Sequence, residues 1–273
     1  MNDNEKFDRI GESRGSKFFK ISEDYIKHTR GFEKKDAKYA MLAFVLLLSV
    51  TAMLGVHSVA LLYQGRGIVH FAWHTWYSYF VGVFLALTMV VVPLLITHFR
   101  KQRLASLGFD ASKKNIIKSL LLTGIFMLFV TLLHLDSILS GNRFSLGDTF
   151  ALSVFTVILV LSLTFGEQMF YRAYIGPRLY GTFKRKALSV IVTGLLFGIG
   201  HIIQFGIGFV TLLGAGVSTY QAVAHMPISI LVGLFNFSVF HAIFHWLYAK
   251  YNSIWSPVLF HFYFNIMGIG FAM

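Results

Sequence analysis

Seven long runs of apolar residues dominate the chain, and short polar segments separate them. Each run is near or above the ~20 residues that an α-helix needs to cross the hydrocarbon core of a membrane. The runs are Ala40–Tyr63, Trp76–His98, Asn115–Ser140, Thr149–Tyr180, Ala187–Leu213, His225–Ala249 and Ser256–Met273. None shows the alternation over ~10 residues that is typical of a membrane-spanning strand. The pattern predicts an all-α, polytopic transmembrane bundle of about seven or eight spans.

The apolar pattern also predicts how the chain is divided. Residues 1–39 form a mostly polar tail, and residues 40–273 form one transmembrane domain. Within the tail, residues 17–38 mix aromatic and charged positions. An amphipathic helix on the membrane surface and a loosely structured tail both remain open there.

The composition excludes an ordinary soluble domain, because 56% of the residues are hydrophobic and only 13% are charged. The net charge of +12 would suit nucleic acid, but its distribution argues against that partner. Basic residues gather in alternate loops, after the second, fourth and sixth runs, and such clusters mark the cytoplasmic side. We therefore expect a cytoplasmic N-terminus and a basic face that meets membrane lipid. The absence of Cys excludes thiolate chemistry.

Glu167 is the only glutamate after residue 33, and it lies inside the fourth apolar run. A carboxylate deep in a bilayer costs at least ~2.5 kcal/mol, so such a residue marks a functional site. Helix lengths place His201 at a similar depth on the next run, since both residues lie about 15 residues from the turn that joins the two helices. We expect the last run to begin with Ser256 as N-cap and to bring His261 and Asn265 to the same level.

These residue types fit hydrolysis of an acyl group. A carboxylate and an imidazole that share one water, Glu167 and His201, can remove its proton and deliver hydroxide to a carbonyl carbon. His261 and Asn265 are spaced i,i+4 and so share a helix face, where two neutral donors suit a developing oxyanion. The alternative is that all four are structural residues that hydrogen-bond between helices.

Two further pairs have the same spacing. Gln168 and Arg172 lie on one face of an α-helix, whereas Glu167 and Arg172 are about 140° apart, so we expect Arg172 to bond to Gln168, to backbone carbonyls or to the loop. His241 and His245 could ligate a divalent metal, but no H-E-x-x-H motif supplies a base beside them.

Three short motifs, in this order, resemble those of the CPBP (CAAX protease and bacteriocin-processing, or Abi) family over about residues 115–273. Residues 167–172 resemble its E-E-x-x-x-R signature, residues 197–201 match its F-x-x-x-H, and residues 261–265 match its H-x-x-x-N. The departure is Gln168, which stands where the signature has its second acid. A catalytically silent protein therefore stays an open alternative.

The resemblance implies an intramembrane endopeptidase that cleaves a hydrophobic or lipidated peptide or protein. Glu167 and His201 would activate water, and His261 with Asn265 would stabilise the tetrahedral intermediate. It leaves open whether a divalent metal such as Zn²⁺ takes part. Bacterial members are linked to peptide processing, bacteriocin immunity and partners in the cell envelope. We expect a multi-pass protein of a cell membrane, with the bacterial plasma membrane favoured.

Overall fold

The computed structural model describes residues 21–63, 67–109, 111–141, 144–145, 150–183, 185–214 and 219–272. Side chains are described in these ranges except at 56–63, 67–78, 186, 202–214, 219–229, 232, 271 and 272. The described residues form helices and short connections, with no strand among them. The all-α class is thereby confirmed.

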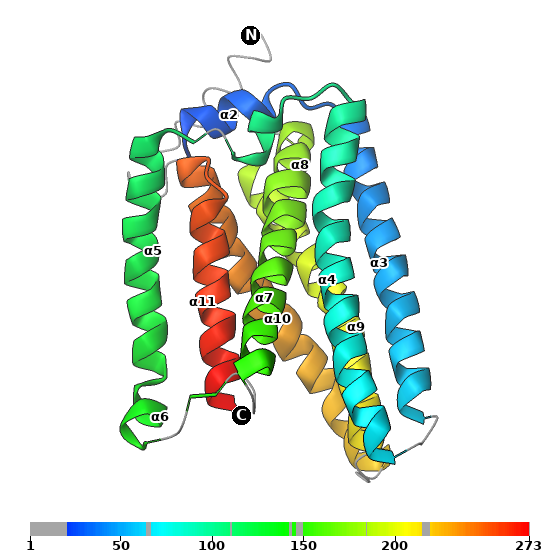
Figure 1. Cartoon of the computed structure of the whole chain (residues 1–273). Helices are drawn as coiled ribbons and strands as arrows, with labels where there is room; N and C mark the ends of the chain where they lie inside the picture. Colours follow the sequence, from blue (N-terminus) through cyan, green and yellow to red (C-terminus); the bar gives the residue numbers. More distant parts are fainter. Residues whose placement is uncertain are drawn as a thin grey trace.

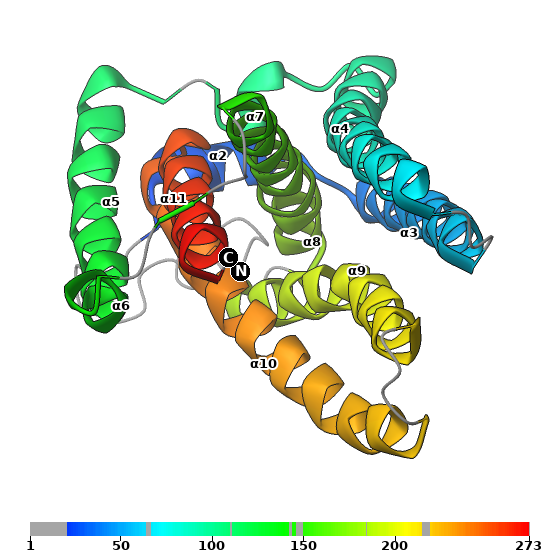
Figure 2. The same cartoon turned by 60° about the horizontal axis from the view of Figure 1, so that its bottom comes forward.

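Seven long helical segments follow the seven apolar runs. Six of them are α3 (Lys34–Tyr63), α4 (Gly67–Phe99), α5 (Lys113–Leu133), α9 (Lys186–Gly214), α10 (Thr219–Tyr251) and α11 (Trp255–Ala272). The seventh is continuous through α7 (Phe150–Glu167), η3 (Gln168–Ile175) and α8 (Gly176–Phe183). The short helices are α2 (Glu23–Thr29), η2 (Leu104–Leu107) and α6 (Leu135–Leu139). The α7–α8 segment runs through the middle, between α5 and α11 on one side and α3 and α4 on the other (Figures 1 and 2).

Four helical segments with described side chains are long and apolar enough to cross a membrane. They are Lys34–Gly55, Tyr79–Phe99, Lys113–Leu133 and Phe150–Phe183, and Ala187–His201 is a shorter apolar segment. The first begins six residues before the start that the apolar pattern predicts. The chain is thus a multi-pass membrane protein by the length and composition of its helices. The count of seven or eight spans and the cytoplasmic N-terminus stay predictions.

The outer surface of the bundle is apolar. On α5, large hydrophobic side chains such as Leu121, Ile125 and Leu128 are at least 60% exposed. A helix with so much apolar surface turned outward is stable in lipid rather than in water. The surface chemistry therefore agrees with the membrane assignment.

α2 lies across one end of the bundle, whereas α11 ends at the opposite end (Figure 1). The backbone N–H of Ser22, the N-cap of α2, donates to the carbonyl of Ala249 at 3.0 Å. Tyr25 is 1% exposed, and its hydroxyl lies 3.4 Å from His245 Nε2 on α10. Part of the predicted tail is therefore an ordered helix that packs on α10, while residues 1–20 lie outside the described residues.

The middle segment η3 is a π-helix, and all eight of its residues are buried. A π-helix uses i→i+5 hydrogen bonds, so each turn holds more residues than an α-helical turn. Pro177 follows η3 almost directly, and because proline has no N–H it removes one backbone hydrogen bond from this continuous helix. The predicted continuation of the helix to Tyr180 is confirmed. The segment is not α-helical throughout, however, and our prediction of which side chains share a face with Arg172 assumed an α-helix.

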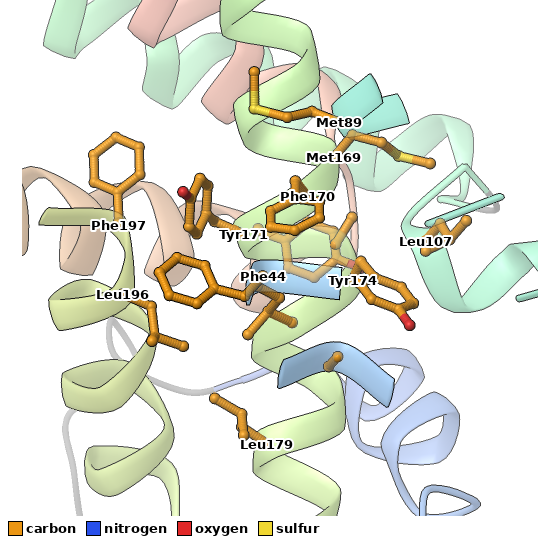
Figure 3. Packing of buried hydrophobic residues seen from close by; sticks show 14 of the residues in the cluster. Phe44, Met89, Leu107, Met169, Phe170, Tyr171, Tyr174, Leu179, Leu196 and Phe197 are labelled. Atoms are coloured by element: carbon orange, nitrogen blue, oxygen red, sulfur yellow. The ribbon is translucent and has the colours of Figure 1, made fainter. Parts of the chain in front are cut away.

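The core of the bundle surrounds this π-segment. The ring of Tyr171 on η3 meets Phe197 of α9 edge-on at 5.1 Å and lies 6.4 Å from Phe44 of α3 (Figure 3). Met89 of α4 packs in the same cluster. Helices α3, α4 and α9 thus converge on η3 and fix its orientation.

Gly166, the residue before Glu167, allows α4 and α7 to touch. A Cβ atom at this position would lie 2.9 Å from the carbonyl oxygen of Ala86 and 3.1 Å from its Cα. Membrane helices use small residues to bring backbones together, because apolar side chains gain little by leaving lipid. The position of Glu167 is therefore set by a backbone contact one residue away.

Helices α5 and α11 are joined by hydroxyl groups. Ser256 donates to the carbonyl of Ser119 at 3.1 Å and also pairs with the hydroxyl of Thr123. Thr131 and Tyr263 are 2.6 Å apart through their oxygens. The expectation that Ser256 is an N-cap is therefore wrong: α11 begins at Trp255, and the hydroxyl of Ser256 bonds to the neighbouring helix instead.

Candidate active site

Glu167, His201 and His261 meet in the interior of the bundle. His201 Nε2 lies 3.5 Å from one carboxylate oxygen of Glu167, and His261 Nδ1 lies 3.6 Å from the other. The residues come from α7, α9 and α11. Their side chains are between 9% and 14% exposed. The predicted convergence of one acid and two imidazoles from separate helices is thus present.

His201 is held in one ring orientation. Its Nδ1 lies 2.8 Å from the carbonyl oxygen of Phe197, which can only accept, so Nδ1 carries a proton. The ring also stacks on Phe237 at 4.1 Å. In the neutral imidazole, Nε2 is then an acceptor that faces the Glu167 carboxylate. Two acceptors in this position need a shared proton or a water that donates to both.

His261 is oriented by Gln168. The Nε2 of Gln168 donates to His261 Nδ1 at 2.8 Å, and Phe244 stacks on the imidazole at 4.7 Å. Because Nδ1 accepts this bond, the proton of the neutral ring lies on Nε2. Gln168 therefore fixes the tautomer of His261 and leaves its Nε2–H as a donor. The sequence motifs gave no signal for this contact.

Asn265 lies one turn further along α11. Its Nδ2 donates to the hydroxyl of Thr164 at 3.4 Å, three residues before Glu167 on α7. Asn265 is thus in the α7–α11 interface next to the candidate site. Its predicted contact with an oxyanion stays a prediction.

Arg172 does not bond to Gln168, and that expectation is wrong. The guanidinium is fully buried, and none of its nitrogens has a hydrogen-bond partner among the described residues. It stacks on the ring of Phe197 at 4.0 Å and lies 5.1 Å from that of Phe244. The physical reason is the π-helix, whose wider turn brings position i+5 toward the face of position i.

His241 and His245 lie one turn apart on α10. Their rings are stacked, with the centroids 5.8 Å apart. His241 is fully buried, and neither of its ring nitrogens has a hydrogen-bond partner in the described part of the chain. His245 lies beside the Tyr25 hydroxyl. Across the described residues, no group of three or more His, Asp or Glu side chains is arranged to hold a metal ion.

A cavity of about 60 Å³ opens beside the carboxylate. Glu167 and His201 form part of its wall, and α3 and α4 supply most of the rest through residues such as Leu48 and Met89. A volume of this size holds a few water molecules, since one water needs about 10–15 Å³ of the same measure. His261 and Asn265 are not among its lining residues. The cavity therefore has room for water beside the Glu167–His201 pair, on the side of α3 and α4.

The fold and this cluster define a class: a helical membrane protein with a carboxylate between two imidazoles in its interior. Residues 148–267 match the family described as "Rce1-like: Type II CAAX prenyl endopeptidase Rce1-like". That part of the chain is thus Rce1-like, which confirms the family resemblance of the motifs. Neither a curated protein nor a solved structure matches the chain.

Proposed function

We propose that this protein is an intramembrane endopeptidase of the CAAX type, which hydrolyses a peptide bond in a prenylated or otherwise hydrophobic substrate. The observation that carries the proposal is the Glu167 carboxylate between His201 and His261, on the wall of a water-sized cavity. The Rce1-like match over residues 148–267 supports the substrate class.

The geometry supports a general-base mechanism. A water at the cavity wall donates to Glu167 and to Nε2 of His201, and both groups accept. Its oxygen bonds to the carbonyl carbon while Glu167 takes the proton, and the carbonyl electron pair moves onto oxygen. The C–N bond then breaks, and Glu167 returns the proton to the leaving amine. The Nε2–H of His261 is the proposed donor to the oxyanion, with Asn265 beside it.

Comparative peptidomics tests the proposal directly. Membranes from cells that carry the intact chain are compared with membranes from cells that carry Glu167→Gln. Peptides released only by the intact chain would identify the scissile bond. A purified-protein assay then uses one synthetic peptide that ends in a CAAX sequence, with and without its prenyl group. Equal turnover of both forms would contradict the prenyl preference, and turnover of neither, with no peptide difference between the cells, would contradict the peptidase.

Gln168 gives a separate prediction about the orientation of His261. Gln168→Leu removes the donor to His261 Nδ1. We expect kcat to fall by about 10–100-fold, as is typical when an orienting partner is lost, with little change in KM. Gln168→Asn shortens the side chain and should show the same loss, whereas a purely packing role predicts that Leu is tolerated.

The replacement of the second signature acid by Gln168 favours one other function, a silent scaffold that binds an envelope partner through the same cavity. Leu48→Trp fills the cavity from α3, so we expect it to abolish cleavage. Leu46→Trp is the matched control, because Leu46 is 50% exposed on the same helix. If the scaffold is correct, Leu48→Trp still removes the cellular phenotype, but Glu167→Gln leaves it intact.

A further inference from the structure

A second hollow lies at the end of the bundle that carries α2, outside the candidate active site. Its volume is about 420 Å³, and its wall is formed by α2, the start of α3 and the segment between α4 and η2. Five Lys or Arg side chains line it, against two carboxylates. The basic residues are Lys27, Lys35, Arg100, Lys101 and Arg103. With neutral histidine, these charges give the hollow a net positive lining.

The floor of this basic hollow is a fixed hydrogen-bond network. Asp36 is 3% exposed, and its Oδ1 accepts from Arg100 Nε at 3.2 Å and from Gln102 Nε2 at 2.8 Å. Buried Arg178 donates to the Oε1 of the same Gln102 at 2.5 Å. The second oxygen of Asp36 accepts from the backbone N–H of Glu33, and the carboxylate forms an ion pair with Arg100. Lys35 forms an ion pair with Glu33 at 2.8 Å. Each of the two carboxylates therefore offsets one cation, and the net positive charge comes from Lys27, Lys101 and Arg103. The rim cations Lys27, Lys101 and Arg103 are exposed.

Ser106 supplies an independent observation. It is 5% exposed and lines the hollow, yet its hydroxyl has no hydrogen-bond partner within the described residues. A buried polar group without a partner costs about 1–3 kcal/mol, and a ligand that bonds to it removes that cost. A hydroxyl donor and several cations around one volume fit an oxyanion.

The position of the hollow points the same way. Lys101 is the left-handed residue that follows the end of α4, with a φ of 52°, and the N–H of Gln102 donates to the carbonyl of Thr97 at 2.9 Å. Two of the spans, Lys34–Gly55 and Tyr79–Phe99, end at the hollow. The hollow therefore lies at the level where a bilayer presents its phosphates.

We propose that this basic hollow is a binding site for a phosphate group. Ser106 donates a hydrogen bond to a phosphate oxygen, Arg100 presents the part of its guanidinium that Asp36 does not use, and Lys27, Lys101 and Arg103 supply the remaining positive charge. The head group of an anionic phospholipid and a soluble phosphate share this chemistry. The site is separate from Glu167 and does not depend on peptidase activity.

The test measures binding to the full chain in a neutral detergent, with two probes. One is short-chain phosphatidic acid, followed by native mass spectrometry, with short-chain phosphatidylcholine for comparison. The other is inorganic phosphate, followed by the shift in thermal unfolding. We expect saturable binding of one phosphate-bearing ligand that weakens as salt is raised. Binding of the lipid alone identifies a head-group site, whereas equal binding of inorganic phosphate identifies a soluble ligand.

The variants are chosen to keep the fold. Ser106→Ala and Lys101→Asn, the second of which tolerates a positive φ, should each weaken binding by about tenfold. Lys113→Gln with Lys114→Gln is the control, because these exposed lysines at the start of α5 lie away from the hollow. Unchanged affinity in both site variants, an equal loss in the control, or no binding of either probe to the intact chain would overturn the proposal.

Discussion

Glu167→Gln is expected to lower the rate of peptide cleavage by about 10²–10⁴-fold, the usual contribution of a general base. The amide has almost the shape of the carboxyl, so packing between His201 and His261 is kept, but it cannot take a proton from water. Single-turnover release of product from a substrate identified by peptidomics measures the effect.

Glu23→Gln is the matched control for this change. Glu23 is an exposed glutamate at the start of α2, and the substitution removes the same charge far from the cluster. We expect full activity in Glu23→Gln and similar thermal unfolding in both variants. Cleavage by Glu167→Gln at the rate of the intact chain would refute the mechanism.

Gly166→Leu is expected to give the largest loss of stability. Its Cβ would press against the backbone of Ala86, which cannot turn away as a side chain can. Overpacking costs about 1–3 kcal/mol where side chains adjust, and we expect at least the upper value here, or a fall in Tm of about 6–12 °C. The displacement of α7 from α4 should also move Glu167 and lower activity.

The control for this prediction is Gly124→Leu. Gly124 is exposed on α5, and a Cβ there would meet no atom within 4 Å. The same substitution should therefore leave Tm and activity close to those of the intact chain. Thermal unfolding in detergent compares the two variants, and equal losses in both would show that the α4–α7 contact is not the cause.

The apolar pattern was sufficient to predict the helices, because a membrane-spanning helix requires a length of apolar chain that few other structures need. It also placed Glu167, His201 and His261 near one level, since the rise per residue converts sequence distance into depth. The structure brings these three together, from helices α7, α9 and α11. Spacing was less informative for Asn265. It predicts that Asn265 shares a helix face with His261, but it does not predict that the side chain donates to Thr164.

The remaining features depend on contacts between distant segments. Nothing in residues 168–175 distinguishes π-winding from α-winding, which is decided by how Tyr171 and its neighbours pack against α3 and α9. The bond from Gln168 to His261 joins residues 93 positions apart, on η3 and α11. Our expectation for Arg172 was wrong because it assumed α-helical geometry through this segment.

The π-turn at Gln168–Ile175 couples the two ends of one helix. It acts like one extra residue in an α-helix, which rotates everything beyond it by about 100° relative to an uninterrupted helix. Glu167 lies before the π-helix and faces the imidazoles. Arg178 lies after it and contacts Gln102 and Thr97, and it can do so only because the π-helix rotates this end of the segment. Deletion of a single residue here would turn Arg178 away from Gln102 and Thr97 or turn Glu167 away from the imidazoles, so both ends keep their partners only with this winding.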